Sequence, residues 1–181
     1  MSGLVLFVAL EDEFPAALAP CPIVYTGVGK VNAALAAAGL FARERPALAL
    51  NYGTAGAVRP GLSGLLEVGA AAQRDMDIRP LGLPLGVTFG DPEPALLRWG
   101  GGLIVGTGDS FAAAPPELHC DLVDMETYAL AKASLRAGVP FRSFKFVTDA
   151  ADEAAAADWE ANKALGASLF ADRLAELANA F

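Results

Sequence analysis

The chain has 181 residues, of which 54% are hydrophobic and 19% are charged, and its formal net charge is −8. A chain of this length suits one domain with a sizeable core, and its composition is too apolar for intrinsic disorder. The acidic balance argues against a nucleic-acid partner, because binding to phosphates needs clustered lysines and arginines. The composition therefore predicts a single folded domain that acts without nucleic acid.

Three features of the sequence bear on its location. Leu4–Leu10 is apolar, but no basic segment precedes it and acids follow at once, which is not typical of a signal peptide. No stretch approaches the roughly 18 uncharged apolar residues that a membrane-spanning helix needs. Cys21 and Cys120 lie far apart and belong to no metal-binding pattern. We therefore expect a soluble, cytoplasmic protein with reduced cysteines, no membrane partner and no metal.

Strand-like and helix-like segments alternate along the chain. Apolar runs typical of strands cover Leu4–Leu10, Pro22–Val28, Ala47–Asn51, Leu65–Arg74, Leu103–Val105, Leu122–Met125 and Phe141–Thr148. Helices are expected at about Lys30–Arg45, Glu126–Ala137 and Ala154–Ala178, with Pro46 ending the first and Gly138 the second. The stretch from Pro80 to Pro94, rich in Gly and Pro, indicates a loop. This alternation predicts an α/β fold in which helices cover both faces of a largely parallel sheet.

Acidic residues stand where three of the expected strands end. The acid loop Glu11–Glu13 follows the first strand, Asp124 and Glu126 flank the end of another, and Asp149 follows the last. Singly, these residues could be a solvated loop, an acid at a helix N-terminus and an N-cap. Ligands of open α/β sheets bind beyond the carboxyl ends of the strands. Together the acids therefore favour one site with acid, base and hydroxyl-binding groups.

Other segments exclude several kinds of chemistry. Gly27-Val28-Gly29-Lys30 does not fit a phosphate-binding P-loop or a dinucleotide fingerprint, and a tight turn between strand and helix explains it. Small residues in Gly53–Gly56 indicate a turn that could cradle a ribose or a water. Phe111, after the next expected turn, would most simply be a core residue. No nucleophile elbow and no histidine cluster is present, so a serine hydrolase or a metal-dependent enzyme has no support.

Five segments together resemble a known superfamily. They are Thr26–Ala34, Asn51–Gly56, Gly108–Phe111, Val123–Glu126 and Val147–Asp152. These segments resemble the purine nucleoside phosphorylases and nucleosidases, and their order and spacing are most similar to those of the 5′-methylthioadenosine/S-adenosylhomocysteine nucleosidases. The resemblance covers nearly the whole chain, and the Met-Glu pair with the Gly-Val-Gly-Lys-Val-Asn-Ala-Ala run is its most specific part.

The resemblance implies a fold, an activity and a set of site residues. The fold would be a three-layer αβα sandwich with a twisted, mostly parallel but mixed sheet, in one domain over residues 1–181. The activity would be hydrolysis of the N-glycosidic bond of a purine nucleoside, without a cofactor, in methionine salvage. Glu13 would activate water, and Asp149 would assist the leaving purine at N7. Substrate-binding residues would be Glu126 at the ribose hydroxyls, Met125 against the sugar, Phe111 and Ala112 at the base, and Thr54, Ala55, Gly56 and Thr148.

Alternatives to this assignment remain. A phosphorylase of the bacterial hexameric type would carry an Arg where this chain has Asn51, and the acid loop has no Arg either. A phosphate dianion would then lack cationic donors, which favours hydrolysis. A hydrolase of another 6-substituted purine nucleoside and a catalytically silent nucleoside-binding module are the other two possibilities.

Two departures from the family pattern leave the 5′-substituent and the oligomeric state open. The segment Ala112–Leu122 is short, and Gln73–Asp77 lacks the aromatic residue and the histidine usual there. We expect a homodimer by analogy alone.

Overall fold

The computed structural model describes residues 3–152 and 155–179. Within these ranges one mixed sheet contains β1 (Leu4–Val8), β2 (Ile23–Tyr25), β3 (Leu48–Ala57), β4 (Gly64–Gln73), β5 (Leu96–Arg98), β6 (Leu103–Thr107), β7 (Leu122–Asp124) and β8 (Phe141–Asp149). The α-helices are α1 (Lys30–Phe41), α2 (Thr127–Ala137) and α3 (Ala155–Ala178), and the short 3₁₀ helices are η1 (Ala16–Leu18) and η2 (Arg79–Leu81). The predicted α/β class and the alternation of elements are confirmed.

The sheet curls until part of it closes on itself. Its strand order is β2-β1-β3-β7-β6-β4-β5, and β8 pairs with both β3 and β4. The strands β3, β8, β4, β6 and β7 therefore form a closed ring, in which β8 is parallel to β3 and antiparallel to β4. Closing a sheet brings the ends of strands that are distant in sequence to one rim. This closure is what gathers the segments of the site described below.

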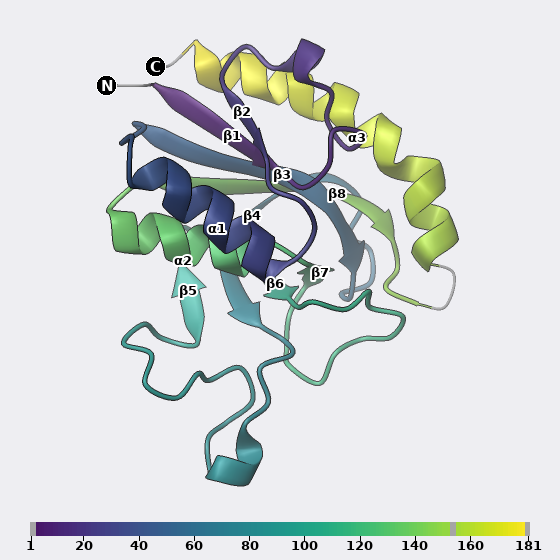
Figure 1. The fold of residues 1–181 in the computed structure, drawn as a ribbon. Coiled ribbons are helices and arrows are strands. Elements are labelled where there is room, and N and C mark those ends of the chain that lie inside the picture. The colour runs from purple at the N-terminus through teal and green to yellow at the C-terminus, as the bar shows by residue number, and fades with distance from the viewer. Residues whose placement is uncertain (1–2, 153–154, 180–181) are drawn as a thin grey trace.

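Helices cover the two faces of the sheet, as the three-layer prediction requires (Figure 1). The face under α3 is packed with aromatic rings, and Phe170 of α3 stacks on Tyr52 of β3 with their centroids 4.4 Å apart. The other face is covered by α1 and α2, whose small buried side chains, such as Ala33 and Ala131, allow close packing on the strands. Both layers thus hold the strands of the ring in fixed positions.

The structure corrects the predicted ends of several elements. Gly53–Gly56 is not a turn but continues β3, because it pairs with β8 as far as Asp149. The helix expected to reach Arg45 ends at Phe41, and a turn follows it at Ala42 and Arg43. The short strand β5 was not predicted, and η2 lies just at the start of the expected loop. The expected start of the last helix, Ala154, lies outside the described residues.

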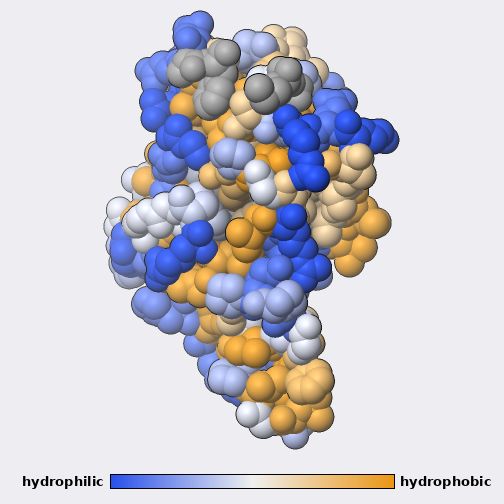
Figure 2. Space-filling view, turned by 90° about the vertical axis from the view of Figure 1, so that its left-hand side faces the viewer, coloured by the Kyte–Doolittle hydropathy of each residue, from blue (hydrophilic) through white to orange (hydrophobic). Residues whose placement is uncertain are grey.

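Apolar side chains are exposed on two parts of the surface. Figure 2 shows apolar residues at the lower tip of the molecule, formed by the loop between β4 and β5, where Leu81 and Phe89 are 71% and 77% exposed. On α1, Val31 and Leu35 are 69% and 68% exposed. In the part of the chain that the structure describes, no helix combines the length and the apolar character that crossing a bilayer demands.

The helix α3 packs closely on the sheet at Gly166. A Cβ atom at Gly166 would lie 2.5 Å from both Cγ of Phe146 and the hydroxyl oxygen of Tyr52. Alanine normally stabilises a helix by about 1 kcal/mol relative to glycine. We expect Gly166→Ala to lower the free energy of unfolding by about 1–3 kcal/mol instead, because the helix must move away from the sheet.

Urea denaturation measures this effect, and Gly39 provides the control. Gly39 lies in α1, and a Cβ atom there would meet no atom within 4 Å outside its own helix. Gly39→Ala should therefore stabilise the protein by about 0.5–1 kcal/mol. Equal stabilisation by both substitutions would show that Gly166 is not needed for packing.

Candidate active site

All ten predicted site residues line one cavity of about 230 Å³. The cavity is formed by β3, β7 and β8, by the loops after β1 and β6, and by the start of α3. The ten residues are Glu13, Thr54, Ala55, Gly56, Phe111, Ala112, Met125, Glu126, Thr148 and Asp149. The acidic segments that end three strands therefore do meet in space.

Glu13 is the member of the acid loop that turns inward. Glu11 and Asp12 are exposed, whereas Glu13 is only 5% exposed. Its Oε1 accepts hydrogen bonds from the backbone N–H of Thr54 at 3.1 Å and from the Thr54 hydroxyl at 2.6 Å. Its Oε2 is buried and has no hydrogen-bond partner among the described residues. One oxygen is thus fixed, and the other is left to accept a proton.

The Glu126 carboxyl contacts the start of a helix other than its own. Glu126 is 9% exposed and directly precedes α2, yet its Oε1 accepts from the backbone N–H of Gly29 at 2.9 Å, just before α1. Gly27 and Gly29 have φ of +78° and +97°, so the predicted tight turn is present and aims this N–H at the site. The turn and the carboxyl thereby hold each other in place across the sheet.

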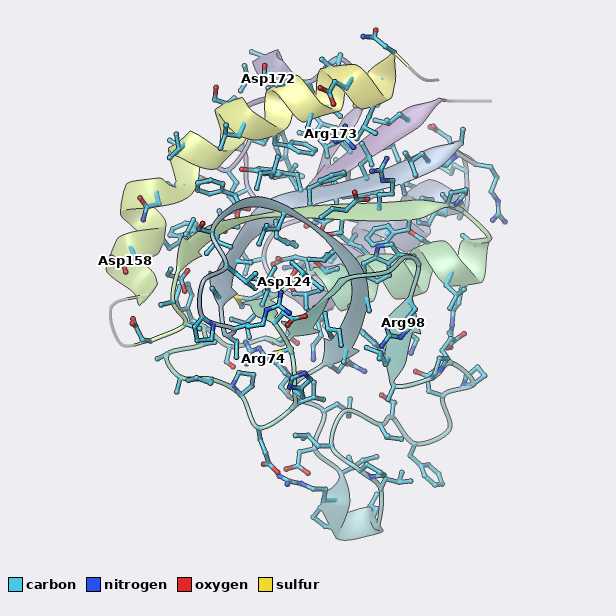
Figure 3. The ribbon with its side chains drawn as sticks, turned by 180° about the vertical axis from the view of Figure 1, so that it is seen from behind. Arg74, Arg98, Asp124, Asp158, Asp172 and Arg173 are labelled. Atoms are coloured by element: carbon cyan, nitrogen blue, oxygen red, sulfur yellow. The ribbon has the colours of Figure 1, made fainter. Side chains whose placement is uncertain are left out.

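A buried ion pair, which the sequence did not reveal, lies beside Glu126. Lys145 Nζ of β8 is 2.9 Å from Asp124 Oδ2 of β7, and their side chains are 0% and 1% exposed. The Asp124 carboxylate also accepts from the hydroxyls of Thr107 at 2.6 Å and Thr127 at 2.5 Å. Burial alone would raise the pKa of Asp124, but the ammonium and the hydroxyl donors outweigh it and lower that pKa. In Figure 3, Asp124 lies near the middle of the molecule, inside the curved strands.

The same surroundings have the opposite effect on Glu126. Burial, and then the negative charge of Asp124, raise the pKa of Glu126 to about 8, although Lys145 and the Gly29 N–H oppose the rise. Glu126 is therefore protonated at neutral pH while Asp124 is ionised. Two carboxyl groups separated by one residue thus have different charges.

Both oxygens of Asp149 accept hydrogen bonds at the end of β8. Oδ2 accepts from the Thr148 hydroxyl at 2.8 Å, and Oδ1 accepts from the Ala151 N–H at 2.9 Å. The second bond caps the following turn, so the simple structural role considered for Asp149 is also present. A Cβ atom at position 56 would lie 2.5 Å from Asp149 Oδ1, so the carboxyl approaches the site only because residue 56 is glycine.

Phe111 and two residues that the sequence did not single out complete the walls. Phe111 is 51% exposed and lines the cavity, so the core position considered for it is wrong. The Arg74 guanidinium lines the cavity and donates to the carbonyl oxygens of Gly108 and Ser110. Trp159 of α3 also lines it and donates its indole N–H to the Thr54 hydroxyl at 2.7 Å. No local motif indicates either residue, because only folding brings them next to lining residues that are distant in sequence.

The side chains of the cavity offer proton transfer and hydroxyl binding. Glu13 has a free acceptor oxygen, Glu126 carries a proton, and Asp149 lies opposite small residues of β3. Across the described ranges, no cluster of three or more His, Cys, Asp or Glu side chains is arranged to hold a metal ion. General acid–base chemistry on a small hydroxylated molecule is what this arrangement provides.

The raised pKa of Glu126 predicts how stability varies with pH. The pKa of a glutamate in an unfolded chain is about 4.3, whereas burial and Asp124 raise the pKa of folded Glu126 to about 8. Between these values the folded state binds a proton that the unfolded state has lost, so the free energy of unfolding falls as the pH rises. Glu126→Gln removes this contribution and should flatten the decline between about pH 5 and about pH 8.

Urea denaturation across this pH range measures the slope. Glu44 is exposed, so Glu44→Gln should retain the wild-type slope. A Glu126→Gln slope equal to that of the wild type would contradict the raised pKa.

Comparisons with known proteins show which family the chain belongs to. A model of the Phosphorylase superfamily matches residues 99–181. The 5′-methylthioadenosine/S-adenosylhomocysteine nucleosidase of Geobacillus thermodenitrificans is 30% identical over an alignment of 160 residues, and the match covers 72% of this chain and 67% of the relative. The corresponding nucleosidase of Geobacillus kaustophilus is 30% identical over 168 residues, covering 76% and 70%.

Solved structures share the fold over essentially the whole chain. Futalosine hydrolase of Helicobacter pylori superposes with a TM-score of 0.91 at 18% identity, covering 99% of this chain and 98% of that one. A mutant nucleosidase of Helicobacter pylori with 5′-methylthioadenosine in its active site has a TM-score of 0.88 at 18% identity and full coverage of both chains. At such identities the likeness shows the fold, while the curated relatives show the family. The chain belongs to the phosphorylase superfamily and, within it, to the family of the 5′-methylthioadenosine/S-adenosylhomocysteine nucleosidases.

Proposed function

We propose that this chain hydrolyses the N-glycosidic bond of an adenine-type purine nucleoside, such as 5′-methylthioadenosine or S-adenosylhomocysteine. Membership of the nucleosidase family confirms the prediction of an N-glycosidic hydrolase. The observation that carries the residue assignments is the meeting of Glu13, Glu126 and Asp149 around one cavity. The substrate and the role of each residue are proposals that this geometry supports.

In the proposed reaction, water attacks the anomeric carbon while the bond to the purine breaks. The oxygen of water forms the new bond to the sugar carbon, and Glu13 Oε2 takes the proton that the water loses. Asp149, in its protonated form, delivers its proton to N7, so that the purine leaves as a neutral base and Asp149 is left as a carboxylate. Glycosyl cleavage passes through an oxocarbenium-like state, and the Glu13 carboxylate stabilises its positive charge. Two carboxyl groups thus divide base and acid roles, as in O-glycoside hydrolases.

Glu126 is assigned to the ribose hydroxyls, with Met125 against the sugar. Glu126 Oε1 already accepts from Gly29, and the proton on the carboxyl leaves a donor for a sugar hydroxyl. A buried acid can bind a hydroxyl in this way without placing a second negative charge next to Asp124. The neutral Glu126 carboxyl therefore suits a hydrogen bond to a ribose hydroxyl of the bound nucleoside.

The base is assigned to the side of the cavity near Asp149. The exposed ring of Phe111 is available to stack on a purine, and the backbone of Ala112 lies at the adjoining edge of the cavity. Ala55, Gly56 and Thr148 also line the cavity, and their small side chains leave room for a flat ring. These positions support the assignment of the base to this side.

Phosphorolysis is the alternative reaction, and the charges of the cavity disfavour it. The described residues that line the cavity include the four carboxyl groups of Glu13, Asp124, Glu126 and Asp149 but one guanidinium, Arg74. That guanidinium donates to the Gly108 and Ser110 carbonyl oxygens, and the Lys145 ammonium is buried against Asp124. A phosphate dianion would meet more negative than positive groups. Water is the better nucleophile for this site.

We also propose a cytoplasmic, homodimeric protein. Cys21 and Cys120 are both free, which fits a reducing compartment. Val31 and Leu35 on α1 are exposed apolar side chains that a second copy of the chain could cover. Sedimentation analysis tests this proposal, and a monomer at every concentration would contradict the dimer.

Chromatography of the purine released from a panel of nucleosides tests the activity. We expect adenine from 5′-methylthioadenosine or S-adenosylhomocysteine, the ribose that keeps its 5′-substituent as the second product, and equal rates with and without phosphate. Futalosine belongs in the panel, because a futalosine hydrolase shares the fold. A requirement for phosphate would identify a phosphorylase, and binding without turnover of any nucleoside would identify a silent binding module.

Glu13→Gln tests the assigned base. The amide keeps an acceptor for Thr54 but cannot take a proton from water, so kcat should fall by about 10²–10⁴-fold. Nucleoside affinity, measured by calorimetry, should stay within about tenfold of the wild type. Glu11→Gln, in the same loop but exposed, is the matched control and should keep full activity. Full activity of the Glu13 variant would remove Glu13 from this role.

A further inference from the structure

A hydrogen-bond chain links α3 to the carboxylate of Glu13. The Trp159 indole N–H donates to Thr54 Oγ1 at 2.7 Å, and Thr54 Oγ1 is 2.6 Å from Glu13 Oε1. An indole nitrogen can only donate, so the Thr54 hydroxyl must be the acceptor of the first bond. Its one hydrogen is then directed to Glu13. The indole, as a second partner of the hydroxyl oxygen, holds the hydroxyl in this orientation toward Glu13.

This direction determines how the two oxygens of Glu13 are used. Oε1 receives the hydrogen of the Thr54 hydroxyl and the backbone N–H of the same residue. Oε2 receives no hydrogen bond from the described residues, although it is buried. A carboxylate with two donors on one oxygen is held in one rotamer, and its other oxygen is the stronger available acceptor. The chain from Trp159 therefore leaves the Oε2 atom for water.

Neighbouring contacts fix Trp159 to the same segments of the site. Lys163 Nζ lies 4.4 Å from the centroid of the Trp159 ring and 2.6 Å from Asp12 Oδ2, next to Glu13 in the acid loop. Asn162 Nδ2 donates to the Thr148 carbonyl oxygen at 2.9 Å, at the end of β8. The start of α3 is thereby tied both to the acid loop and to the strand that carries Asp149.

We propose that Trp159 is a positioning residue for the hydrolysis: its indole N–H orients the Thr54 hydroxyl toward Glu13, so that Glu13 presents Oε2 to the attacking water. This inference rests on the proposed function. Trp159 acts through Thr54 and Glu13 and takes no proton itself.

Trp159→Phe tests the inference by removing the indole N–H while keeping an aromatic ring. We expect kcat to fall by about five- to tenfold, the usual effect of one oriented hydrogen bond, with KM within about twofold. The other tryptophan of the chain, Trp99, donates its indole N–H to the Val68 carbonyl oxygen at 2.9 Å and packs on Phe141, and it does not line the cavity. Trp99→Phe is therefore the matched control and should leave kcat unchanged.

A double-mutant cycle with Thr54 separates orientation from simple packing. In a Thr54→Val background the hydroxyl is gone, so adding Trp159→Phe should lower kcat by less than about twofold further. Thr54→Ser restores the hydroxyl, and the full effect of Trp159→Phe should return with it. An equal effect of Trp159→Phe in the wild-type and Thr54→Val backgrounds would overturn the proposal.

An NMR measurement keeps the inference separate from the proposed activity. With ¹⁵N-labelled tryptophan the protein gives one indole cross-peak for each of its two tryptophans, and Trp99→Phe assigns them. Thr54→Val should shift the Trp159 cross-peak and speed its hydrogen exchange, but leave that of Trp99 in place. An unmoved Trp159 cross-peak would refute the hydrogen bond. A shifted cross-peak in a protein that cleaves no nucleoside would instead refute the proposed function, and with it the role of Trp159 in hydrolysis, but not the hydrogen bond to Thr54.

Discussion

The buried ion pair between Asp124 and Lys145 is the interaction on which the site depends. It joins β7 to β8 inside the ring of strands, and neither side chain reaches solvent. Losing one partner of such a pair typically costs about 3–5 kcal/mol, because the other charge is left buried and alone. Thr107 and Thr127 satisfy further lone pairs of Asp124, so the carboxylate is held in one place. Because Glu126 is only two residues away, the fixed position of Asp124 also restricts the position of Glu126.

The charges of the site follow from this pair. Four carboxyl groups line the cavity, and the ammonium of Lys145 neutralises Asp124. A second full negative charge beside Asp124 would be unfavourable in a buried setting, so Glu126 keeps its proton at neutral pH. Glu13 lines the same cavity, and its Oε1 accepts two hydrogen bonds from Thr54. One ion pair thus keeps Asp124 charged while Glu126, two residues away, is neutral.

Sequence reasoning reached the fold class and the meeting of the acids but not the interactions that hold them. Strand ends could be placed because apolar runs stop at acidic residues, and Gly138 ended α2 as expected, with its left-handed backbone. Lys145 was missed because a lysine inside an apolar strand gives no hint of the partner that compensates its charge. Trp159 was missed because one aromatic residue near the start of a long helix is usually a packing residue. Both residues act through contacts with residues that are distant in sequence, and such contacts cannot be inferred from a single sequence.

Gly53–Gly56, which the sequence suggested to be a turn, is the part of β3 that lets the polar groups of the site approach one another. These residues form a strand, and its two glycines lie close to polar groups of the site. A Cβ atom at Gly53 would lie 3.2 Å from Lys145 Nζ, and one at Gly56 would lie 2.5 Å from Asp149 Oδ1. Between them, Thr54 supplies both donors to Glu13. Larger side chains at the two glycines would push away Lys145 and Asp149, so these glycines are required by the cavity and not by a turn.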